Sequence, residues 1–446
     1  MLTYALNSPN KPLYEQLYEN IKSDILKSVL KGGYKLPSKR TFASHLGISV
    51  ITVQNAYNQL LIEGFIYSKE RSGYFVTKGI KPIKKEVTAP AKKESKKEES
   101  FINLSSSNKS SFPLSSWNKI LREIISKNSD KIYQNVPFNG VDELRSAISK
   151  HLFEYHNLKA DKDLIIIGAG AQYLYILITQ LLGKDMVFAL ENISDTKIGR
   201  IYQSLGVRCE FIEVDENGMS IDSLRKSGAN VAHLSPASNF PTGNLMPITR
   251  RSELLEWVSL ENERFIIEDE YLGEMRDRTI PPLKSINSQK VIFMNTFSKT
   301  LLPTLRISYM VLPEHLMDKF RENLSFYSST VPIFEQLTLA KFINDGYFER
   351  YLARSKKENS LKKADMIKTI KEFDSSMEFK ESLTHLLLPL NLSSDELKTK
   401  AKKDGFLVNS LDDYCYTNKN SKDKTVALID INSDTKDLVK FLKAIS

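Results

Sequence analysis

Apolar residues near the N-terminus recur at the spacing of a helix. Between Pro12 and Leu30 they follow three- and four-residue steps, at Leu13, Leu17, Ile21, Ile25 and Leu26. This spacing places them on one face of a helix, and the two glycines at 32 and 33 are expected to stop it. The pattern therefore predicts a first helix over residues 12–30.

Two further helices are predicted between Pro37 and Gly64. Ser38 is suited to cap the second helix, which should end in a tight turn at Gly47. Ser49 is suited to cap the third, over residues 50–63, because a serine hydroxyl can accept from a free N–H of the first turn. The apolar runs 65–67 and 73–76 then predict two strands around a polar tip.

Three helices followed by a hairpin are typical of a winged helix-turn-helix domain, although a plain three-helix bundle with a hairpin would show the same pattern. The third helix would then enter the major groove of DNA. Its polar side chains can reach base edges, and basic side chains around it can reach phosphates. The predicted DNA-binding residues are Lys39, Arg40, Ser49, Thr52, Gln54, Asn55, Lys69 and Arg71.

The composition of the chain indicates a linker between two domains, whereas its net charge is less informative. Residues 78–100 contain no aromatic side chain and few apolar ones, so they are predicted to be a flexible linker. The formal net charge of +9 suits a nucleic-acid partner, but lysine-rich surfaces also produce such a surplus. We therefore expect a DNA-binding domain at 1–77 and a second domain at 101–446, with its large part at about 135–315.

The second domain alternates apolar strands with amphipathic helices, as an α/β domain does. One of these strands, at 291–294, leads into a polar loop that contains Thr296, Ser298 and Lys299, and Arg306 follows. A lysine in such a loop can form a Schiff base with a carbonyl cofactor. The two hydroxyls and the guanidinium are suited to a phosphate. A solvated surface lysine is the alternative for Lys299.

Two other predicted strands end in residues that could bind other parts of such a cofactor. The strand 264–269 delivers Asp269, which can pair with a protonated ring nitrogen, and Tyr271, which can bind a phenolic oxygen. A solvated acidic loop is the alternative there. The strand 164–167 runs into Gly170, Ala171 and Gln172 at the start of a helix, where free N–H groups favour a phosphate.

Two parts of the sequence each resemble a known protein family. The stretch LPSKRTFASHLGISVITVQNAYNQLLIEGFIYSKERSGYFV resembles the DNA-binding domain of the GntR family. The remainder, including FNGVDELRSAI, SPASNFPTG and TFSKTLLPTLRISYMVLP, resembles the fold-type I PLP enzymes of the aspartate aminotransferase superfamily. The whole chain is similar to the MocR/GabR subfamily, in which both domains are joined.

The resemblance implies a set of roles. Lys299 would hold pyridoxal 5'-phosphate covalently, Asp269 would pair its pyridine nitrogen, and Tyr271 its phenolic oxygen. The phosphate would be held by Thr296, Ser298, Arg306, Gly170, Ala171 and Gln172. It also implies a head-to-tail homodimer that binds double-stranded operator DNA and a small-molecule effector.

This sequence departs from the family pattern at positions that, in the family, contact the substrate or the cofactor ring. Asp195 stands at the position of an aromatic residue that would stack on the pyridine ring, with Lys197 nearby. No arginine follows Arg354, so the late arginine that reads a substrate carboxylate is missing. Ser238 and Asn239 replace a common His-Gln pair. In the DNA-binding domain, Val50 stands where the family often has arginine.

These features predict a regulator that responds to PLP itself, or to an amino acid or amine condensed with PLP. A genuine PLP-dependent aminotransferase with an accessory DNA-binding domain is the alternative, and a scaffold that has lost PLP is a third interpretation. No long apolar run or signal-like N-terminus is present, so a cytoplasmic protein is expected. Cys209 and Cys415 are too few for a disulfide framework or a thiolate metal site, and no metal is expected.

Overall fold

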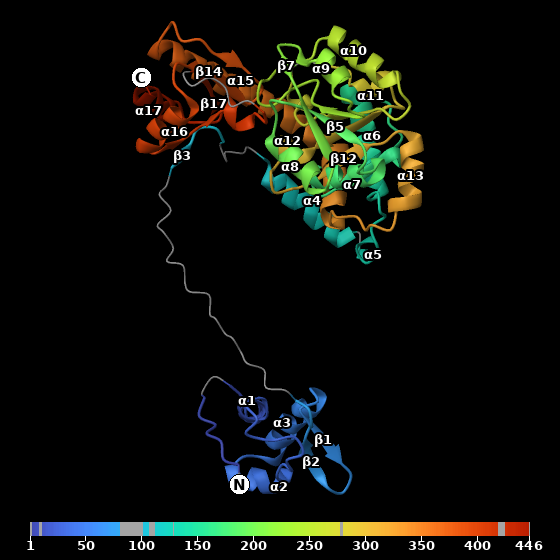
Figure 1. Ribbon diagram of the computed structural model, residues 1–446, viewed down its shortest axis with the longest axis vertical. Coiled ribbons are helices and arrows are strands. Elements are labelled where there is room, and N and C mark those ends of the chain that lie inside the picture. Colours follow the sequence, from blue (N-terminus) through green and yellow to red (C-terminus); the bar gives the residue numbers. More distant parts are fainter. Residues whose placement is uncertain are drawn as a thin grey trace. The chain divides into compact units, whose positions relative to one another are not determined.

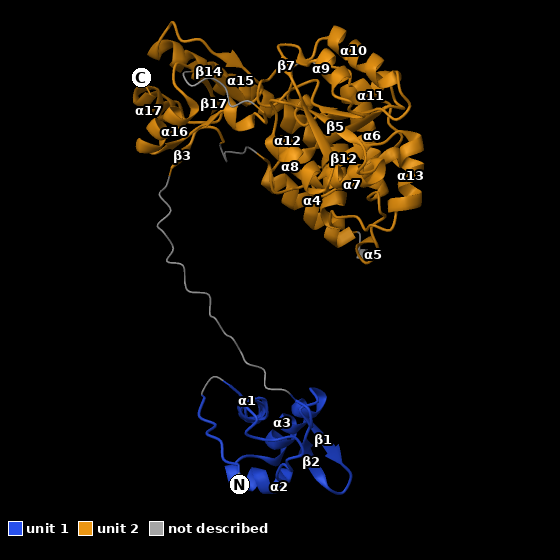
Figure 2. Ribbon diagram, in the orientation of Figure 1, with its two compact units in different colours: residues 1–98 blue, residues 99–446 orange. Residues whose placement is uncertain are grey.

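The computed structural model describes residues 2–8, 11–80, 101–106, 112–127, 129–276, 280–417 and 424–445. Contacts divide the chain into two compact units, unit 1 at residues 1–98 and unit 2 at residues 99–446 (Figure 2). Most of the predicted linker, residues 81–100, lies outside the described residues.

Unit 1 is a winged helix built from three helices and one hairpin (Figure 1). Its elements are α1 (Leu13–Leu26), α2 (Lys39–Leu46), α3 (Val50–Ile62), β1 (Ile66–Lys69) and β2 (Gly73–Val76). Both predicted caps are present, because the Ser38 hydroxyl accepts from the Thr41 N–H and the Ser49 hydroxyl from the Thr52 N–H. Gly47 ends α2 with φ +67°, a left-handed conformation that glycine adopts without steric cost.

The first helix is shorter than its apolar spacing predicts. It ends at Leu26 rather than at residue 30, and Ser28 takes a left-handed φ of 62°. Leu30 is nonetheless only 3% exposed, because it joins the core of unit 1 from the loop that follows. Of the five periodic residues, Leu17, Ile21 and Ile25 are buried as predicted, whereas Leu13 is 44% exposed.

The hairpin pairs β1 and β2 in antiparallel register, with Ile66 opposite Val76 and Lys69 opposite Gly73. It is longer than predicted, since the ladder includes Ser68 and Lys69, which were expected at the tip. Arg71, at the tip, takes a left-handed φ of 55°. Tyr57 of α3 donates to the carbonyl oxygen of Pro37 and packs in the core beneath the helices.

Unit 2 is built around a seven-stranded sheet in the order β4-β12-β11-β10-β9-β5-β6. Strand β12 runs antiparallel to its neighbours β4 and β11, and the other neighbouring pairs are parallel. The strands are β4 (Ile165–Gly168), β5 (Val187–Glu191), β6 (Arg208–Ile212), β9 (Val231–Leu234), β10 (Phe265–Asp269), β11 (Val291–Thr296) and β12 (Ser308–Val311).

Helices cover both faces of this sheet, which explains why its strands read as continuous apolar runs. One face packs on α7 (Ala171–Leu182), α8 (Thr196–Ser204) and α13 (Glu314–Leu324). The other packs on α4 (Leu114–Lys127), α6 (Asp142–His156), α9 (Ile221–Lys226), α10 (Ile248–Ser259), α11 (Leu283–Ile286) and α14 (Ile333–Asn344). Helices α4 and α14 thus pack on the large sheet although they lie outside residues 135–315.

A smaller sheet, in the order β13-β14-β17-β16, forms a second lobe of unit 2 (Figure 1). Its strands are β13 (Lys380–Glu381), β14 (His385–Leu390), β16 (Asn409–Ser410) and β17 (Thr425–Asp430). The core of this lobe includes residues of α15 (Tyr347–Phe373), α16 (Ser394–Lys403) and α17 (Thr435–Ile445). Strand β3 (Ile102–Asn103) pairs with β15 (Phe406–Leu407) and brings the beginning of unit 2 to this lobe.

Short elements complete unit 2. They are α5 (Ser129–Ile132), η1 (Lys162–Leu164), β7 (Val214–Asp215), β8 (Gly218–Met219), η2 (Gly273–Met275), α12 (Phe297–Thr300) and η3 (Leu411–Tyr414). Among the residues that the structure describes, no helix is long and apolar enough to cross a membrane.

Candidate functional site

A cavity of about 190 Å³ lies at one edge of the large sheet. The carboxyl ends of β5, β9, β10 and β11 meet there, which is where open α/β sheets bind ligands. Because β12 is antiparallel, its beginning reaches the same edge. Eight of the nine predicted cofactor residues line the cavity, namely Ala171, Gln172, Asp269, Tyr271, Thr296, Ser298, Lys299 and Arg306. The ninth, Gly170, is the N-cap of α7.

The loop after β11 presents the lysine. The Thr296 hydroxyl accepts from the Ser298 N–H and from the Ser308 hydroxyl, and so caps α12. Ser298 is 8% exposed, and its hydroxyl has no hydrogen-bond partner among the described residues. The next residue, Lys299, is exposed and lines the cavity. One loop therefore supplies an amine and an unused hydroxyl to the same space.

Arg306 lies against the beginning of α7. Gly170 has φ +91°, and a Cβ atom there would collide with the Arg306 guanidinium. Arg306 itself takes a left-handed φ of 51°, which is uncommon for a residue with a side chain. No side chain caps α7 in the described part of the chain, so its first N–H groups and the guanidinium together present positive charge to an anion.

Asp269 ends β10 and is only 5% exposed. The Tyr175 hydroxyl donates to its Oδ2 over 2.5 Å, and Nε2 of His233 lies 3.4 Å from the same oxygen. A buried carboxylate is suited to a protonated ring nitrogen, and the hydrogen bond from Tyr175 compensates part of the cost of burying it.

Tyr271 stands two residues beyond Asp269. Burial and the negative charges of Asp269 and Glu270 raise the pKa of its phenol well above the ordinary value. The hydroxyl therefore keeps its proton at neutral pH, and a protonated phenol can donate to an anionic oxygen of a ligand.

Sequence reasoning missed several groups that line the cavity, among them Tyr175, Glu191, His233 and Phe240. Tyr175 lies one helical turn after Ala171, so the spacing from the predicted phosphate turn could have indicated it. His233 lies within the apolar strand β9 and gives no local signal. Glu191 ends β5, and burial raises its pKa to about 7 despite a hydrogen bond from Asn239.

Two of the positions at which the sequence departs from the family, Asp195 and Lys197, lie at this cavity. Asp195 caps α8 by accepting from the Lys197 N–H, and both residues line the cavity. Strand β17 carries buried apolar residues, Ala427 among them, where a carboxylate-reading arginine was sought. Among the described residues that line the cavity, Arg306 is the sole arginine, while three carboxylates are present, those of Glu191, Asp195 and Asp269.

The predicted DNA-binding residues of unit 1 gather around the beginning of α3. Thr52, Gln54 and Asn55 lie on its first two turns, and Gln54 and Asn55 are exposed. The Lys39 ammonium group donates to Oε1 of Gln54 over 3.5 Å and lies 5.7 Å from the centroid of the Tyr74 ring. Helix α2, helix α3 and the wing are thereby joined at one surface.

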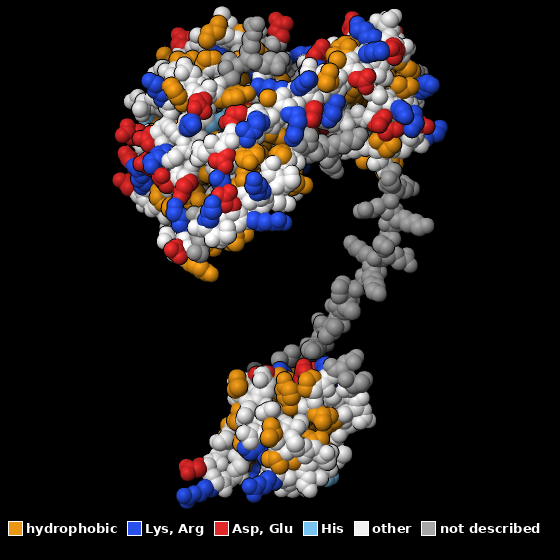
Figure 3. Space-filling view, turned by 180° about the vertical axis from the view of Figure 1, so that it is seen from behind, with side chains coloured by type: hydrophobic (Ala, Val, Ile, Leu, Met, Phe, Trp, Pro, Cys, Tyr) orange, Lys and Arg blue, Asp and Glu red, His pale blue; other side chains and the backbone are white. Residues whose placement is uncertain are grey.

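The other basic residues flank this surface. Arg40 on α2 and Lys69 and Arg71 on the hairpin are exposed. In the view of Figure 3, Lys and Arg side chains of unit 1 gather at the end that carries the hairpin. Ser49 is occupied as a cap, since its hydroxyl accepts from the Thr52 N–H and lies 2.8 Å from the Thr52 hydroxyl.

Two apolar residues at the beginning of α3 extend the surface beyond the prediction. Val50 is 42% exposed and Ile51 is 71% exposed. Apolar side chains on a recognition helix can contact the methyl group of thymine. Position 50 therefore carries an exposed apolar side chain where the family often has arginine.

Comparison with sequence families matches both units. The family described as "Bacterial regulatory proteins, gntR family" matches residues 13–76. The family described as "Aminotransferase class I and II" matches residues 99–378.

Curated relatives span most of the chain. The HTH-type transcriptional regulator YdeL of Bacillus subtilis is 33% identical over 407 residues, covering 88% of each chain. The HTH-type pyridoxine biosynthesis transcriptional regulator PdxR of Corynebacterium glutamicum is 27% identical, covering 79% of this chain and 78% of its own. The probable rhizopine catabolism regulatory protein MocR of Rhizobium meliloti is 26% identical, covering 78% and 74%.

Solved structures share the fold of unit 2. Kynurenine aminotransferase of Pyrococcus horikoshii, solved with PMP, matches with a TM-score of 0.66 and 22% identity. The match covers 78% of this chain and 90% of that one. It identifies the aminotransferase fold, in agreement with the fold class predicted from the sequence.

Proposed function

We propose an effector for this chain from the premise that it belongs to the gntR family of bacterial regulatory proteins, in the MocR-type group that joins a winged helix to an aminotransferase class I and II domain. As a member it is a DNA-binding transcriptional regulator. Our proposal is that unit 2 binds pyridoxal 5'-phosphate (PLP) and that PLP itself is the signal.

The proposal rests first on how well the cavity fits PLP. The cavity offers an amine on Lys299, a buried carboxylate on Asp269 and a protonated phenol on Tyr271. The unpartnered Ser298 hydroxyl and the Arg306 guanidinium, set against Gly170 at the beginning of α7, fit a phosphate. These groups match an aldehyde, a ring nitrogen, a phenolic oxygen and a phosphate, one for each polar part of PLP.

In this assignment the residues of the chain anchor and orient the cofactor. PLP supplies an aldehyde that condenses with a primary amine. Asp269, which accepts a hydrogen bond from Tyr175, would face the ring nitrogen, and Tyr271 would donate to the phenolic oxygen. Arg306 and the N–H groups of α7 neutralise the phosphate.

One observation supports PLP alone as the effector. The cavity has groups for PLP, but Arg306 is its sole arginine among the described lining residues, and that guanidinium is assigned to the phosphate. Glu191 and Asp195 line the remainder and would repel a substrate carboxylate when ionised. An α-amino acid would therefore find the cofactor but no bidentate partner for its own carboxylate. The relative PdxR, described as a regulator of pyridoxine biosynthesis, supports this assignment.

Regulation then requires that PLP binding change the affinity of the winged helix for DNA. We propose that the chain acts as a head-to-tail homodimer whose two winged helices bind paired half-sites. PLP must favour one arrangement of the dimer over the other by several kcal/mol to shift most of the population. The dimer is tested by sedimentation velocity on the full chain, where a monomer in the presence of both PLP and DNA would contradict it.

The effector is tested by two titrations of the purified full chain. The absorbance spectrum is recorded with PLP and then with a panel of amino acids and amines, while DNA binding is followed by fluorescence anisotropy on DNA from upstream of its own gene. We expect PLP alone to change the anisotropy and the panel to add nothing. A response that appears only when one amine joins PLP would instead identify a metabolite sensor.

A PLP-dependent aminotransferase with an accessory DNA-binding domain is the second candidate, because unit 2 has the aminotransferase fold. It predicts steady conversion of an amino acid and a keto acid at rates typical of enzymes, roughly 1 s⁻¹ or more. Our proposal expects no sustained turnover, and such turnover would overturn it in favour of the enzyme.

A further inference from the structure

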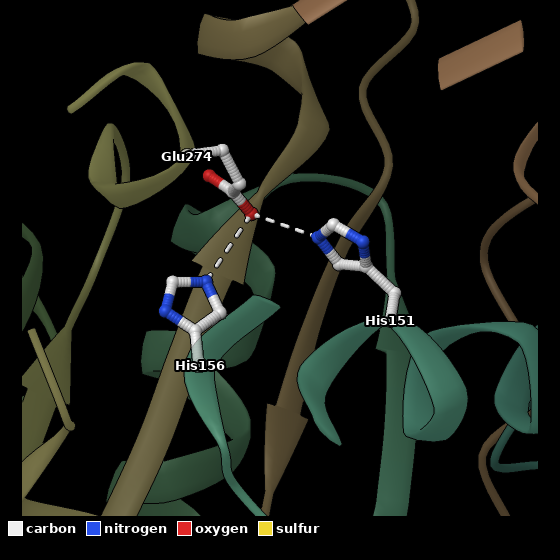
Figure 4. Close-up of side chains that lie close together, drawn as sticks. All are labelled: His151, His156 and Glu274. Carbon is white, nitrogen blue, oxygen red and sulfur yellow. Dashed lines mark ion pairs between the residues drawn. The ribbon is translucent and has the colours of Figure 1, made fainter. Parts of the chain in front are cut away.

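Three buried side chains converge in unit 2 away from the cavity. His151 and His156 lie on α6 and Glu274 lies in η2, and the three are 2%, 4% and 1% exposed. Figure 4 shows both imidazoles directed at the carboxylate. Nε2 of His151 lies 3.6 Å from Oε1 of Glu274, and Nε2 of His156 lies 3.9 Å from the same oxygen.

Most of these polar atoms lack a partner in the described part of the protein, although Oε1 of Glu274 accepts from the Asn295 amide. Both Nε2 atoms and Oε2 of Glu274 lack a hydrogen-bond partner among the described residues. The two separations are too long for hydrogen bonds. Buried polar atoms are almost always paired, so three unpaired atoms in one place indicate that a group belongs between them.

Hydrogen bonds do not account for the arrangement. Each neutral imidazole could carry its proton on Nε2 and direct it at Oε1 of Glu274, but at 3.6 and 3.9 Å neither contact is a hydrogen bond. A metal ion can accept a lone pair from both imidazoles and from the carboxylate at once. The ligand atoms already lie within 4.8 Å of one another.

The spacing is close to that of a metal site. With metal–ligand bonds of about 2.0–2.2 Å, two ligands of a tetrahedral ion stand roughly 3.4 Å apart. The two His–Glu separations of 3.6 and 3.9 Å are near that value, and all three ligand atoms lie within 4.8 Å of one another. Two imidazoles and one carboxylate are also a common ligand set for zinc.

Neighbouring groups hold the carboxylate in place, as partners of metal ligands do. Asn295 donates to Oε1 of Glu274 over 2.7 Å, and the Tyr155 hydroxyl donates to the Glu274 carbonyl oxygen over 3.3 Å.

We propose that His151, His156 and Glu274 bind one divalent ion of the zinc class, with a fourth position for water. His151 also lines a surface hollow together with Glu154 and Glu349. The bound ion would join α6 to η2. Through Asn295 it would also brace the end of β11, four residues before Lys299.

The test uses the full chain without an affinity tag. After removal of metal with a chelator, Zn²⁺ binding is measured by competition and elemental analysis, and Co²⁺ binding by its visible absorption. We expect one ion per chain and a higher melting temperature in Zn²⁺. His156→Gln and Glu274→Gln should each weaken Zn²⁺ binding at least tenfold, whereas His315→Gln, at a histidine outside the cluster, should not.

The Co²⁺ spectrum of the wild-type chain keeps the test valid if a variant fails to fold. Tetrahedral Co²⁺ absorbs strongly in the visible, and this signal does not depend on any substitution. Failure of the wild-type chain to bind either ion stoichiometrically would overturn the proposal. So would equal Zn²⁺ affinity in folded His156→Gln and His315→Gln, which would place the bound ion elsewhere.

Discussion

The Tyr175 hydroxyl donates a hydrogen bond of 2.5 Å to Oδ2 of Asp269, and it thereby ties α7 to the end of β10. The two elements carry different parts of the proposed PLP site. Gly170 is the N-cap of helix α7, where the phosphate would lie, and Asp269 would meet the ring nitrogen at the opposite end of the cofactor. One hydrogen bond therefore fixes the distance between two anchoring points.

Tyr175→Phe should weaken PLP binding without unfolding the protein. The variant keeps the aromatic ring but removes the hydroxyl that donates to the buried Asp269. Of the two neighbouring groups, only Nε2 of His233, 3.4 Å from Oδ2, would then remain. Hydrogen bonds to charged groups contribute about 1.5–3 kcal/mol, so the Kd for PLP should rise roughly tenfold or more. Absorbance titration measures it. Tyr173→Phe on the same helix is the matched control, and equal PLP affinity in the two variants would contradict the assigned role of Tyr175.

Thr52→Ala combined with Asn55→Ala should weaken binding to the specific DNA site. Both residues lie on the first turns of α3, and loss of base contacts costs about 1–3 kcal/mol each. We expect an increase of at least roughly tenfold in Kd for the specific site, with non-specific binding and PLP binding unchanged. Anisotropy on specific and scrambled DNA provides the comparison. An unchanged ratio of the two affinities would show that α3 is not the recognition helix.

Glu191 predicts a pH dependence of stability. The folded chain keeps this proton up to a pKa of about 7, whereas the unfolded chain releases it near the ordinary value of 4.5. Between these values the folded state binds more protons, so stability falls as pH rises. The loss attributable to Glu191 is complete above pH 7 and amounts to at most about 3 kcal/mol.

Glu191→Gln removes this titration. Urea unfolding at pH 5 and pH 8 should show a smaller loss of stability in the variant than in the wild-type chain, while Glu378→Gln, an exposed control, should behave like wild type. If Glu191→Gln and wild type lost the same stability between the two pH values, the buried carboxyl would not be the group that titrates.

Local signals carried most of the sequence-based prediction. Ser38 and Ser49 cap α2 and α3 as predicted, because a cap depends on residues within one turn. The functional residues at the ends of strands could also be predicted from the sequence. Asp269 and Lys299 follow apolar strands, and the parallel sheet brings the two strand ends to one edge.

Contacts between segments that are distant in the sequence could not be predicted in this way. His233 meets Asp269 only because β9 and β10 are neighbours in the sheet, and nothing within β9 marks this histidine. His156 and Glu274 are 118 positions apart in the sequence and meet only in the fold. A single sequence shows such pairs as separate residues, which explains why no metal was expected.

The central claim, that PLP held on Lys299 controls DNA binding, is tested most directly by one titration. Fluorescence anisotropy on upstream DNA is followed as PLP is added to the wild-type chain, to Lys299→Ala and to Lys197→Ala, a control at another lysine of the cavity. The account predicts a PLP-dependent change in wild type and in Lys197→Ala, and none in Lys299→Ala, which should also lose borohydride-reducible PLP. An equal response in Lys299→Ala and wild type, or no response in wild type, would contradict it.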